Sequence, residues 1–245
     1  MRKTFHAGSE HQRHEQAGAE FARLQRFSAA LASVPDAQCP RPLEMLFDPP
    51  GLRMTYVAGV DLFTFLRRGR LDDAARDGLA ATMAAAIDAY VGALGEPHPD
   101  FKFENVLYDA AGGGLAFVDL GLPQDATQPL PGASPYETTL GDLLGSVVFQ
   151  SVQPRHVLRR GQHRRTVALG LAVMLAVARL PGAAVRDEYV SRVAAAAYRR
   201  CAFGGGASRS AWYATVGLLA GRRVRLRAQT AGPVLPRRRR PEATP

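Results

Sequence analysis

Two short polar stretches, separated by a turn-rich segment, constrain this chain more than any other part of its sequence. The first stretch contains a histidine, a carboxylate, an ammonium and an amide, at His98, Asp100, Lys102 and Asn105. The second adds another carboxylate, Asp119, directly after an apolar run. An ordinary solvated loop has no need for this combination at these spacings. We therefore expect the five side chains to share one polar site.

A β-hairpin is predicted between the two stretches. Residues 106–108 and 115–118 are apolar and typical of strands, and residues 109–114 between them include three consecutive glycines. Such a short glycine-rich connection favours a tight antiparallel turn. The hairpin would bring Asn105, at the start of the first strand, and Asp119, at the end of the second, to the same end.

This pattern resembles the catalytic loop and the metal-binding loop of the protein-kinase-like superfamily. The family motif is His-x-Asp-x-Lys-x-x-Asn followed by Asp-x-Gly. The match uses His98, Asp100, Lys102 and Asn105, and then Asp119 with Gly121. Gly121 would allow the backbone to turn tightly after Asp119.

The resemblance implies a role for each side chain. Phosphoryl transfer depends mainly on positioning and charge neutralisation. Asp100 would orient the attacking hydroxyl and accept its proton, and Lys102 would stabilise charge on the transferred phosphate. Asn105 and Asp119 would supply the hard oxygen ligands that Mg²⁺ prefers. His98 would brace the loop rather than act as a general base.

A lysine and a glutamate near the start of the chain are predicted to pair. Met1 to Phe5 are expected to form a strand, and His11 to Leu31 a helix, because apolar residues recur there near the helical period. In the resembling family, a strand lysine contacts the ATP phosphates and a helix glutamate orients it. Lys3 and Glu20 would take these roles, with Glu15 as the competing partner.

The following segment resembles the kinase hinge. After a loop over 35–42, strands are predicted over 43–47 and 52–57, joined by a turn at 48–51. The sequence Ala58-Gly59-Val60-Asp61-Leu62 then follows. The resemblance implies that the backbone of Thr55, Tyr56 and Val57 contacts adenine and that Met54 lines its pocket.

The remainder of the chain is predicted to be mainly helical. Asp142 could hydrogen-bond to the His98 loop or could simply occupy the first turn of a helix. The loop after Gly121 is expected to be about 15 residues long and irregular. Beyond about Arg227 we expect disorder. The predicted helices cover residues 61–66, 72–94, 140–151, 167–180, 187–203 and 210–219.

Composition narrows the class of protein. Only two of the 31 basic residues are lysines, Lys3 and Lys102, and both fall where a kinase-like site needs one. The net charge of +9 comes from arginines concentrated towards the C-terminus, and aromatic residues are poorly interleaved with them, so specific nucleic-acid binding is not expected. Peripheral contact with an anionic membrane remains open. Cys39 and Cys201 lack partners at metal-binding spacing, which fits a reducing, cytoplasmic setting.

The sequence therefore predicts an α+β, bilobal protein-kinase-like fold. Residues 1–57 would form a reduced N-terminal lobe, residues 58–227 a helical C-terminal lobe, and residues 228–245 a disordered basic tail. The predicted function is ATP- and Mg²⁺-dependent phosphotransfer to a hydroxyl of a sugar, a lipid-linked glycan or another small molecule. The oligomeric state is open.

The glycine-rich loop that covers the phosphates in kinase-like proteins is the missing part of the resemblance. Only two residues precede Lys3, so we expect that loop to be absent from this sequence. Three explanations stay open: the true start lies upstream, the family variant lacks this loop, or the protein no longer catalyses. The third makes an inactive pseudokinase that binds nucleotide or a partner the alternative function.

Overall fold

The computed structural model describes residues 1–6, 8–69, 71–120, 131–151 and 160–203. Its architecture is mixed α+β, as predicted, and its strands form two small sheets. Several predictions lie outside the described residues: the turn at Gly121, most of the loop behind it, the helix over 210–219 and the disordered tail. Within the described residues, no helix has both the length and the apolar content needed to cross a membrane.

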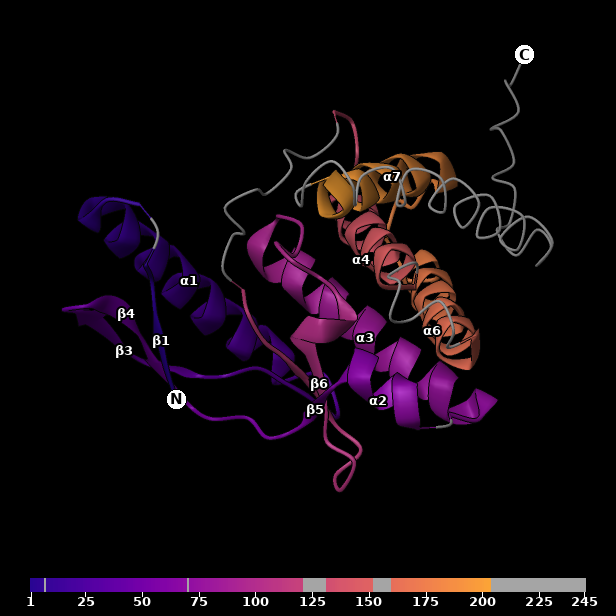
Figure 1. The fold of residues 1–245 in the computed structure, drawn as a ribbon, viewed down its shortest axis with the longest axis horizontal. Coiled ribbons are helices and arrows are strands. Elements are labelled where there is room, and N and C mark those ends of the chain that lie inside the picture. Colours follow the sequence, from indigo (N-terminus) through magenta and orange to yellow (C-terminus); the bar gives the residue numbers. More distant parts are fainter. Residues whose placement is uncertain (7, 70, 121–130, 152–159, 204–245) are drawn as a thin grey trace, which may run out of the picture.

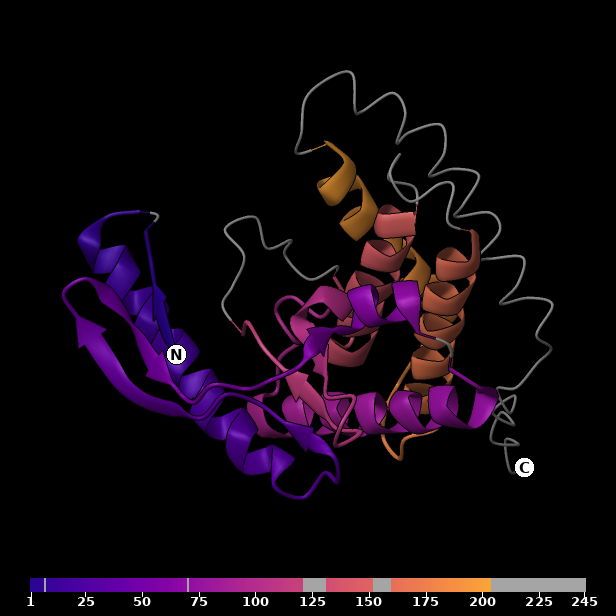
Figure 2. The same ribbon diagram turned by 60° about the horizontal axis from the view of Figure 1, so that its bottom comes forward.

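One group of elements combines a three-stranded sheet with a long helix. Strands β1 (Arg2–Thr4), β4 (Pro50–Met54) and β3 (Pro42–Phe47) form an antiparallel sheet in the order β1-β4-β3. Helix α1 (Glu10–Leu31) packs against it. The group lies to one side of the helical part of the molecule (Figures 1 and 2).

A second sheet lies between this group and the helices. Its order is β2-β7-β6-β5, formed by Ala37–Gln38, Leu115–Phe117, Val106–Tyr108 and Val60–Asp61 respectively. Strands β6 and β7 form the predicted antiparallel hairpin. The sequence did not reveal β2 and β5, because a strand of two residues has no side-chain period. Strand β2 pairs in parallel with β7 and so attaches the end of α1 to the hairpin.

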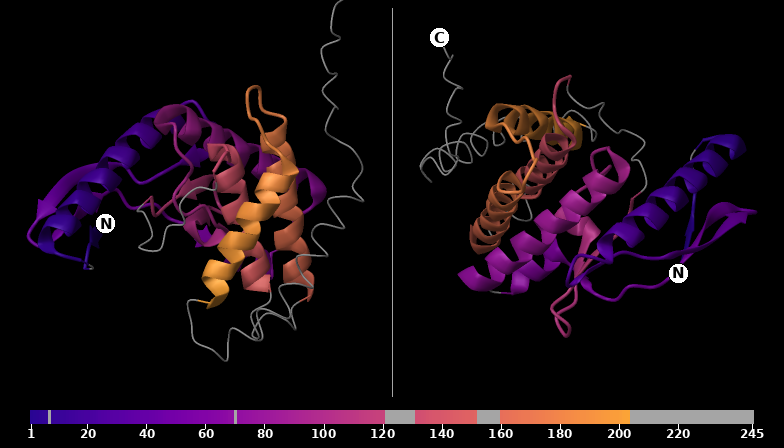
Figure 3. Two further views of the ribbon diagram at one scale, coloured as in Figure 1. Left: turned by 90° about the horizontal axis from the view of Figure 1, so that it is seen from above. Right: turned by 180° about the vertical axis from the view of Figure 1, so that it is seen from behind.

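The helical part contains α2 (Leu62–Arg68), α3 (Asp73–Leu94), α4 (Pro135–Ser151), α6 (Arg160–Ala178) and α7 (Asp187–Phe203). Helix α4 contacts both α6 and α7, and α3 packs against α6 (Figures 1 and 3). Gly141 and Gly145, one turn apart on α4, allow the close approach of α7. A Cβ atom at Gly141 would lie only 2.3 Å from Cβ of Val193.

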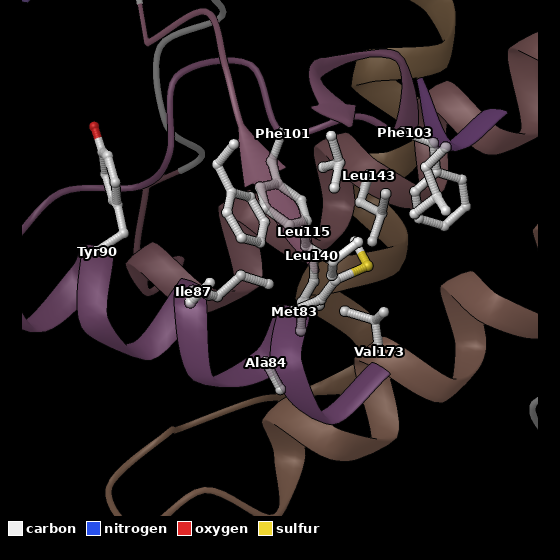
Figure 4. Close-up of a cluster of buried hydrophobic side chains, with 14 of the residues drawn as sticks. Met83, Ala84, Ile87, Tyr90, Phe101, Phe103, Leu115, Leu140, Leu143 and Val173 are labelled. Carbon is white, nitrogen blue, oxygen red and sulfur yellow. The ribbon is translucent and has the colours of Figure 1, made fainter. Parts of the chain in front are cut away.

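The buried core anchors the loop that carries Asp100 and Lys102. Phe101 and Phe103 alternate with these polar residues, and both phenylalanines are at most 2% exposed. In an extended segment, alternate side chains point to opposite sides, so burying the phenylalanines directs the polar residues away from the core. Figure 4 shows both rings among core side chains of α3, α4, α6 and β7: Met83, Ile87, Leu115, Leu140, Leu143 and Val173.

Three predicted elements had wrong boundaries. Strand β4 begins at Pro50 and ends at Met54, so residues 55–57 leave the strand. Helix α6 begins at Arg160 rather than at residue 167. Helix α4 begins at Pro135 rather than at residue 140.

A capping box explains the early start of α4. The Ser134 hydroxyl accepts a hydrogen bond from the Glu137 N–H at 3.2 Å, and the Glu137 carboxylate accepts one from the Ser134 N–H at 2.7 Å. These reciprocal bonds satisfy two backbone donors, and Pro135 has no N–H to satisfy. The Ser-Pro-x-Glu sequence was the missed signal.

Candidate functional site

Lys3 lies at the meeting point of three elements. Its Nζ atom is 2.8 Å and 2.9 Å from the two carboxylate oxygens of Glu20 and 2.6 Å from Oδ1 of Asp119. The predicted pairing of Lys3 with Glu20 is therefore present. Glu15, the competing partner, instead lies 3.3 Å from His11 on the exposed side of α1.

Strand pairing and the packing of α1 bring these three residues together. Lys3 is opposite Leu52 in the β1–β4 ladder, which places it on the sheet that α1 covers. Glu20 on α1 is 2% exposed and faces that sheet. Asp119 follows β7 by two residues and adopts a left-handed φ of +60°, which few residues other than glycine, asparagine and aspartate adopt.

The charges in this cluster favour a protonated lysine. Burial alone would lower the pKa of Lys3, but the Glu20 and Asp119 carboxylates oppose this, and the net shift of its pKa is upward. Burial raises the pKa of Glu20, and the nearby Lys3 ammonium counteracts that rise. Lys3 therefore presents a fixed positive charge beside the half-exposed Asp119.

Asp100, Lys102 and Asn105 form a second cluster. Oδ2 of Asp100 lies 2.5 Å from Nζ of Lys102 and 2.9 Å from Nδ2 of Asn105. The Asn105 amide also donates to the backbone oxygen of Asp100 at 3.0 Å. Both side-chain donors thus use the same oxygen, and Oδ1 of Asp100 accepts no hydrogen bond from the described residues.

The two clusters adjoin one another. The N–H of Val118, which directly precedes Asp119, donates to the Asn105 backbone oxygen at 2.9 Å. Burial alone would lower the pKa of Lys102. The Asp100 carboxylate, and more weakly those of Glu104 and Asp119, oppose this effect, so the net shift of its pKa is upward. Lys102 thus lies in the electrostatic field of both Asp100 and Asp119. The five expected polar side chains do gather in one region.

His98 braces the loop, as predicted. It is 3% exposed, and its Nδ1 accepts a 3.3 Å hydrogen bond from the Asp100 N–H. The backbone N–H of His98 donates to Oγ1 of Thr139 on α4 at 3.0 Å. Burial lowers the pKa of His98 to about 3, so the ring is neutral at physiological pH. This supports a structural role and not that of a general base.

The ring of His98 also contacts three aromatic side chains. Its centroid lies 4.9 Å from that of Tyr90, 5.2 Å from that of Phe101 and 6.4 Å from that of Phe27. The bracing contacts therefore come from α1, α3 and the loop itself. This packing fixes the backbone immediately before Asp100.

Asn105 and Asp119 are compatible with magnesium. Within the described residues, no group of three or more histidine, cysteine or acidic side chains could hold a metal ion alone. Mg²⁺, however, usually takes one or two carboxylates together with substrate phosphates. Because Asn105 uses its amide nitrogen for Asp100, its amide oxygen is left for a ligand role. The Asp119 side chain is 50% exposed and could accept the ion.

The segment predicted to contact adenine has mixed properties. Met54 and Val57 are buried, whereas Tyr56 is 75% exposed. The Thr55 N–H already donates to the Arg41 backbone oxygen at 2.9 Å, so it is engaged. The N–H groups of Tyr56 and Val57 have no backbone acceptor in the described part of the chain. Their contact with adenine stays a prediction.

Sequence reasoning missed several residues around the site. Thr139 supports His98, a role for which the sequence had offered Asp142, one turn further along α4, as one of two alternatives. The other alternative, that Asp142 occupies the first turn of a helix, was wrong, because α4 begins at Pro135. The role of Asp142 stays a prediction. Asp61 caps α2 by accepting from the Thr64 N–H at 2.7 Å, a helix-start signal that could have been recognised. Glu104 has a buried Oε1 without a hydrogen-bond partner among the described residues, and burial raises its pKa.

Comparison with known proteins found similarity to solved structures but no sequence match. No protein-family model matches the chain, and no curated protein matches it. Among solved structures, the chain is similar to the Cydia pomonella granulovirus kinase PK-1, with a TM-score of 0.38 and 20% sequence identity. The match covers 71% of this chain and 61% of the viral kinase, less than two thirds of its length.

Proposed function

We propose that this chain has a protein-kinase-like fold and is an ATP- and Mg²⁺-dependent phosphotransferase that acts on a hydroxyl group. One observation carries the proposal: a single lysine, Lys3, bridges a buried helix carboxylate and Asp119, which adjoins the loop of Asp100, Lys102 and Asn105. This arrangement combines two fixed cations, a candidate general base and hard oxygen ligands. Phosphoryl transfer needs these groups.

Each residue has a distinct part in the proposed reaction. Asp100 uses Oδ1, the oxygen left by Lys102 and Asn105, to accept a hydrogen bond from the acceptor hydroxyl. Lys102 and Lys3 bind phosphate oxygens. Asn105 and Asp119 hold Mg²⁺, which would supply charge neutralisation of the phosphates. Met54 and the backbone of residues 55–57 hold adenine. The Thr55 N–H is not one of the donors, because it already donates to the Arg41 backbone oxygen.

We propose a small acceptor, such as a sugar, a lipid-linked glycan or another small molecule. The chain between Asp119 and the first residue of α4 comprises only residues 120–134. The start of this segment is fixed by β7, and its end by the Ser134 capping box. Little chain remains to form a groove for a peptide substrate.

The test is production of ADP from ATP and Mg²⁺, measured with water as acceptor and with a panel of sugars. Asp100→Ala removes the candidate base, and Asp77→Ala removes a surface carboxylate, 64% exposed, on α3 as a matched control. The proposal expects a loss of about 10²- to 10⁴-fold for Asp100→Ala, typical of a general base, and none for Asp77→Ala. Equal background rates for all three proteins would contradict it and favour the inactive binding module.

A further inference from the structure

Helix α1 is fastened to the end of α3 by polar contacts that the proposed reaction does not use. Nε of Arg23 on α1 lies 2.7 Å from Oε1 of Glu96, the second residue after α3. The Tyr90 hydroxyl donates to the same oxygen at 3.3 Å, and the Arg26 guanidinium donates to the Ala93 backbone oxygen. The two helices pack against each other (Figure 3). We name the ion pair of Arg23 and Glu96 the α1–α3 clamp.

The α1–α3 clamp connects the two halves of the candidate site. Arg23 follows Glu20 by three residues, so the two side chains are neighbours on the surface of α1. Glu96 precedes His98 by two residues, and His98 accepts the hydrogen bond of the Asp100 N–H. One ion pair thus joins the helix that carries Glu20 to the loop that carries Asp100.

Apolar packing beside the clamp does not by itself fix the position of α1. The ring centroid of Phe27 on α1 lies 5.1 Å from that of Tyr90 and 6.4 Å from that of His98. Such packing stabilises the contact but is non-directional. The Arg23 side chain is only 15% exposed, so solvent ions screen its charge less than that of a surface arginine. A charge-assisted hydrogen bond has a defined distance and direction, so the clamp is suited to fix α1 along α3.

We propose that Arg23 and Glu96 are positioning residues, which hold α1 where Glu20 meets Lys3 beside Asp119. Loss of the pair would leave the aromatic contacts in place but would allow α1 to shift. A displacement of about 1 Å can lower the rate of a reaction about 10²-fold. The effect on catalysis rests on the proposed phosphotransferase function, whereas the holding of α1 does not.

Amide hydrogen exchange of α1, measured by mass spectrometry without nucleotide, tests the clamp itself. Arg23→Met and Glu96→Gln should each speed exchange in α1 about 10-fold, the lower end for loss of a hydrogen bond to a charged group. Arg23→Lys keeps a cation and should exchange at close to the native rate. Arg76→Met is the matched control, because Arg76 pairs with Asp73 and Asp77 on its own helix, α3, and its loss should leave exchange in α1 unchanged.

Turnover of ATP and Mg²⁺ tests whether the clamp acts through Glu20. Arg23→Met should lower kcat by up to about 10²-fold. The same substitution should have little further effect in a Glu20→Gln protein, because Glu20 then no longer holds Lys3 as a carboxylate. A merely structural loss would instead add to that of Glu20→Gln, as the effects of independent sites do. Circular dichroism verifies that each variant keeps its helices.

Several results would overturn the proposal. One is native-rate exchange of α1 in both Arg23→Met and Glu96→Gln, and another is equal acceleration in Arg76→Met. Faster exchange with an unchanged kcat, or a loss that adds to that of Glu20→Gln, would contradict the positioning role. If the native protein produces no ADP, the proposed function fails, and the exchange rates still decide whether the clamp holds α1.

Discussion

Lys3 and Asp119 are separated by 116 positions in the sequence, yet Nζ of the lysine lies 2.6 Å from Oδ1 of the aspartate. Neither residue lies on a helix, and strand pairing determines the position of each. Strand β1 places Lys3 beside β4, and β7, which lies between β2 and β6, leads into Asp119. Because Glu20 holds the same ammonium from α1, the lysine has little freedom to leave. The pair thus places a cation where a nucleotide phosphate and its metal ion are proposed to bind.

Replacing Lys3 by methionine should weaken ATP binding about 10- to 100-fold, since hydrogen bonds to charged groups contribute about 1.5–3 kcal/mol. Arg2→Met is the matched control, because Arg2 precedes it on the same strand and is exposed. Calorimetric titration of both variants with Mg²⁺ and ATP measures the difference. Equal affinities for the two variants would remove Lys3 from the proposed site.

Acid should destabilise the fold through His98. The pKa of this residue is lowered by burial to about 3, from the ordinary value near 6.5 expected in the unfolded chain. As the pH falls, this histidine therefore binds a proton in the unfolded state before it does so in the folded state. The contribution of His98 to stability is complete above about pH 6.5 and falls towards pH 3.

The measurement is the free energy of unfolding in urea at about pH 7 and about pH 5. His98→Asn keeps an acceptor for the Asp100 N–H but cannot titrate. Over this interval the native protein should lose about 2 kcal/mol more than the variant does, at about 1.36 kcal/mol per pH unit below the unfolded pKa. Parallel losses in the two proteins would show that His98 does not titrate on unfolding.

Glu137 should matter more for stability than a neighbouring surface glutamate. Its side chain is fully inaccessible, lies 2.8 Å from Nε of Arg186, and accepts a backbone hydrogen bond from Arg186 at 2.8 Å. Burial alone would raise the pKa of Glu137, but Arg186 and backbone donors lower it overall. Glu137 therefore stabilises the fold fully above the pKa that it has in the unfolded chain. This stabilisation is lost as the pH falls through the lower pKa of the folded state.

Glu137→Gln should accordingly lower the urea midpoint at neutral pH and have a smaller effect in acid. Glu188→Gln, on exposed α7 surface, should change the free energy of unfolding by less than about 0.5 kcal/mol. If the two variants unfold at the same urea concentration, the Glu137–Arg186 pair makes no net contribution.

Adding one methyl group should have opposite effects on α4 and α3. At Gly141 a new Cβ would lie 2.3 Å from Val193 Cβ and 2.4 Å from its Cγ1, so Gly141→Ala should cost about 1–3 kcal/mol through overpacking. At Gly78 on α3 a Cβ would meet nothing within 4 Å, so Gly78→Ala should stabilise by about 0.5–1 kcal/mol. Thermal melts distinguish the two, and a tolerated Gly141→Ala would disprove the close α4–α7 packing.

The sequence predicted the parts of the site that depend on local pattern. The hairpin of β6 and β7 follows from its glycine-rich turn, and it does bring Asn105 beside Val118 and Asp119. The pairing of Lys3 with Glu20 was chosen over Glu15 through family resemblance and the apolar period of α1.

Other features depend on three-dimensional contacts that leave little trace in the sequence. Strand β2 exists because Ala37 and Gln38 lie beside β7, and two residues carry no detectable strand period. Thr139 supports His98 only because the packing of α4 places it there. The early start of α4 was predictable from Ser134 and Glu137, and its capping box was overlooked.

The most direct test of the account is calorimetric titration of the protein with ATP in the presence and absence of Mg²⁺, repeated for Asp119→Asn. The proposed function predicts binding that Mg²⁺ strengthens, and loss of that metal dependence in the variant, because Asp119 is proposed to hold the ion beside Lys3. Absence of ATP binding by the native protein, or an equal Mg²⁺ effect in the native protein and Asp119→Asn, would contradict it.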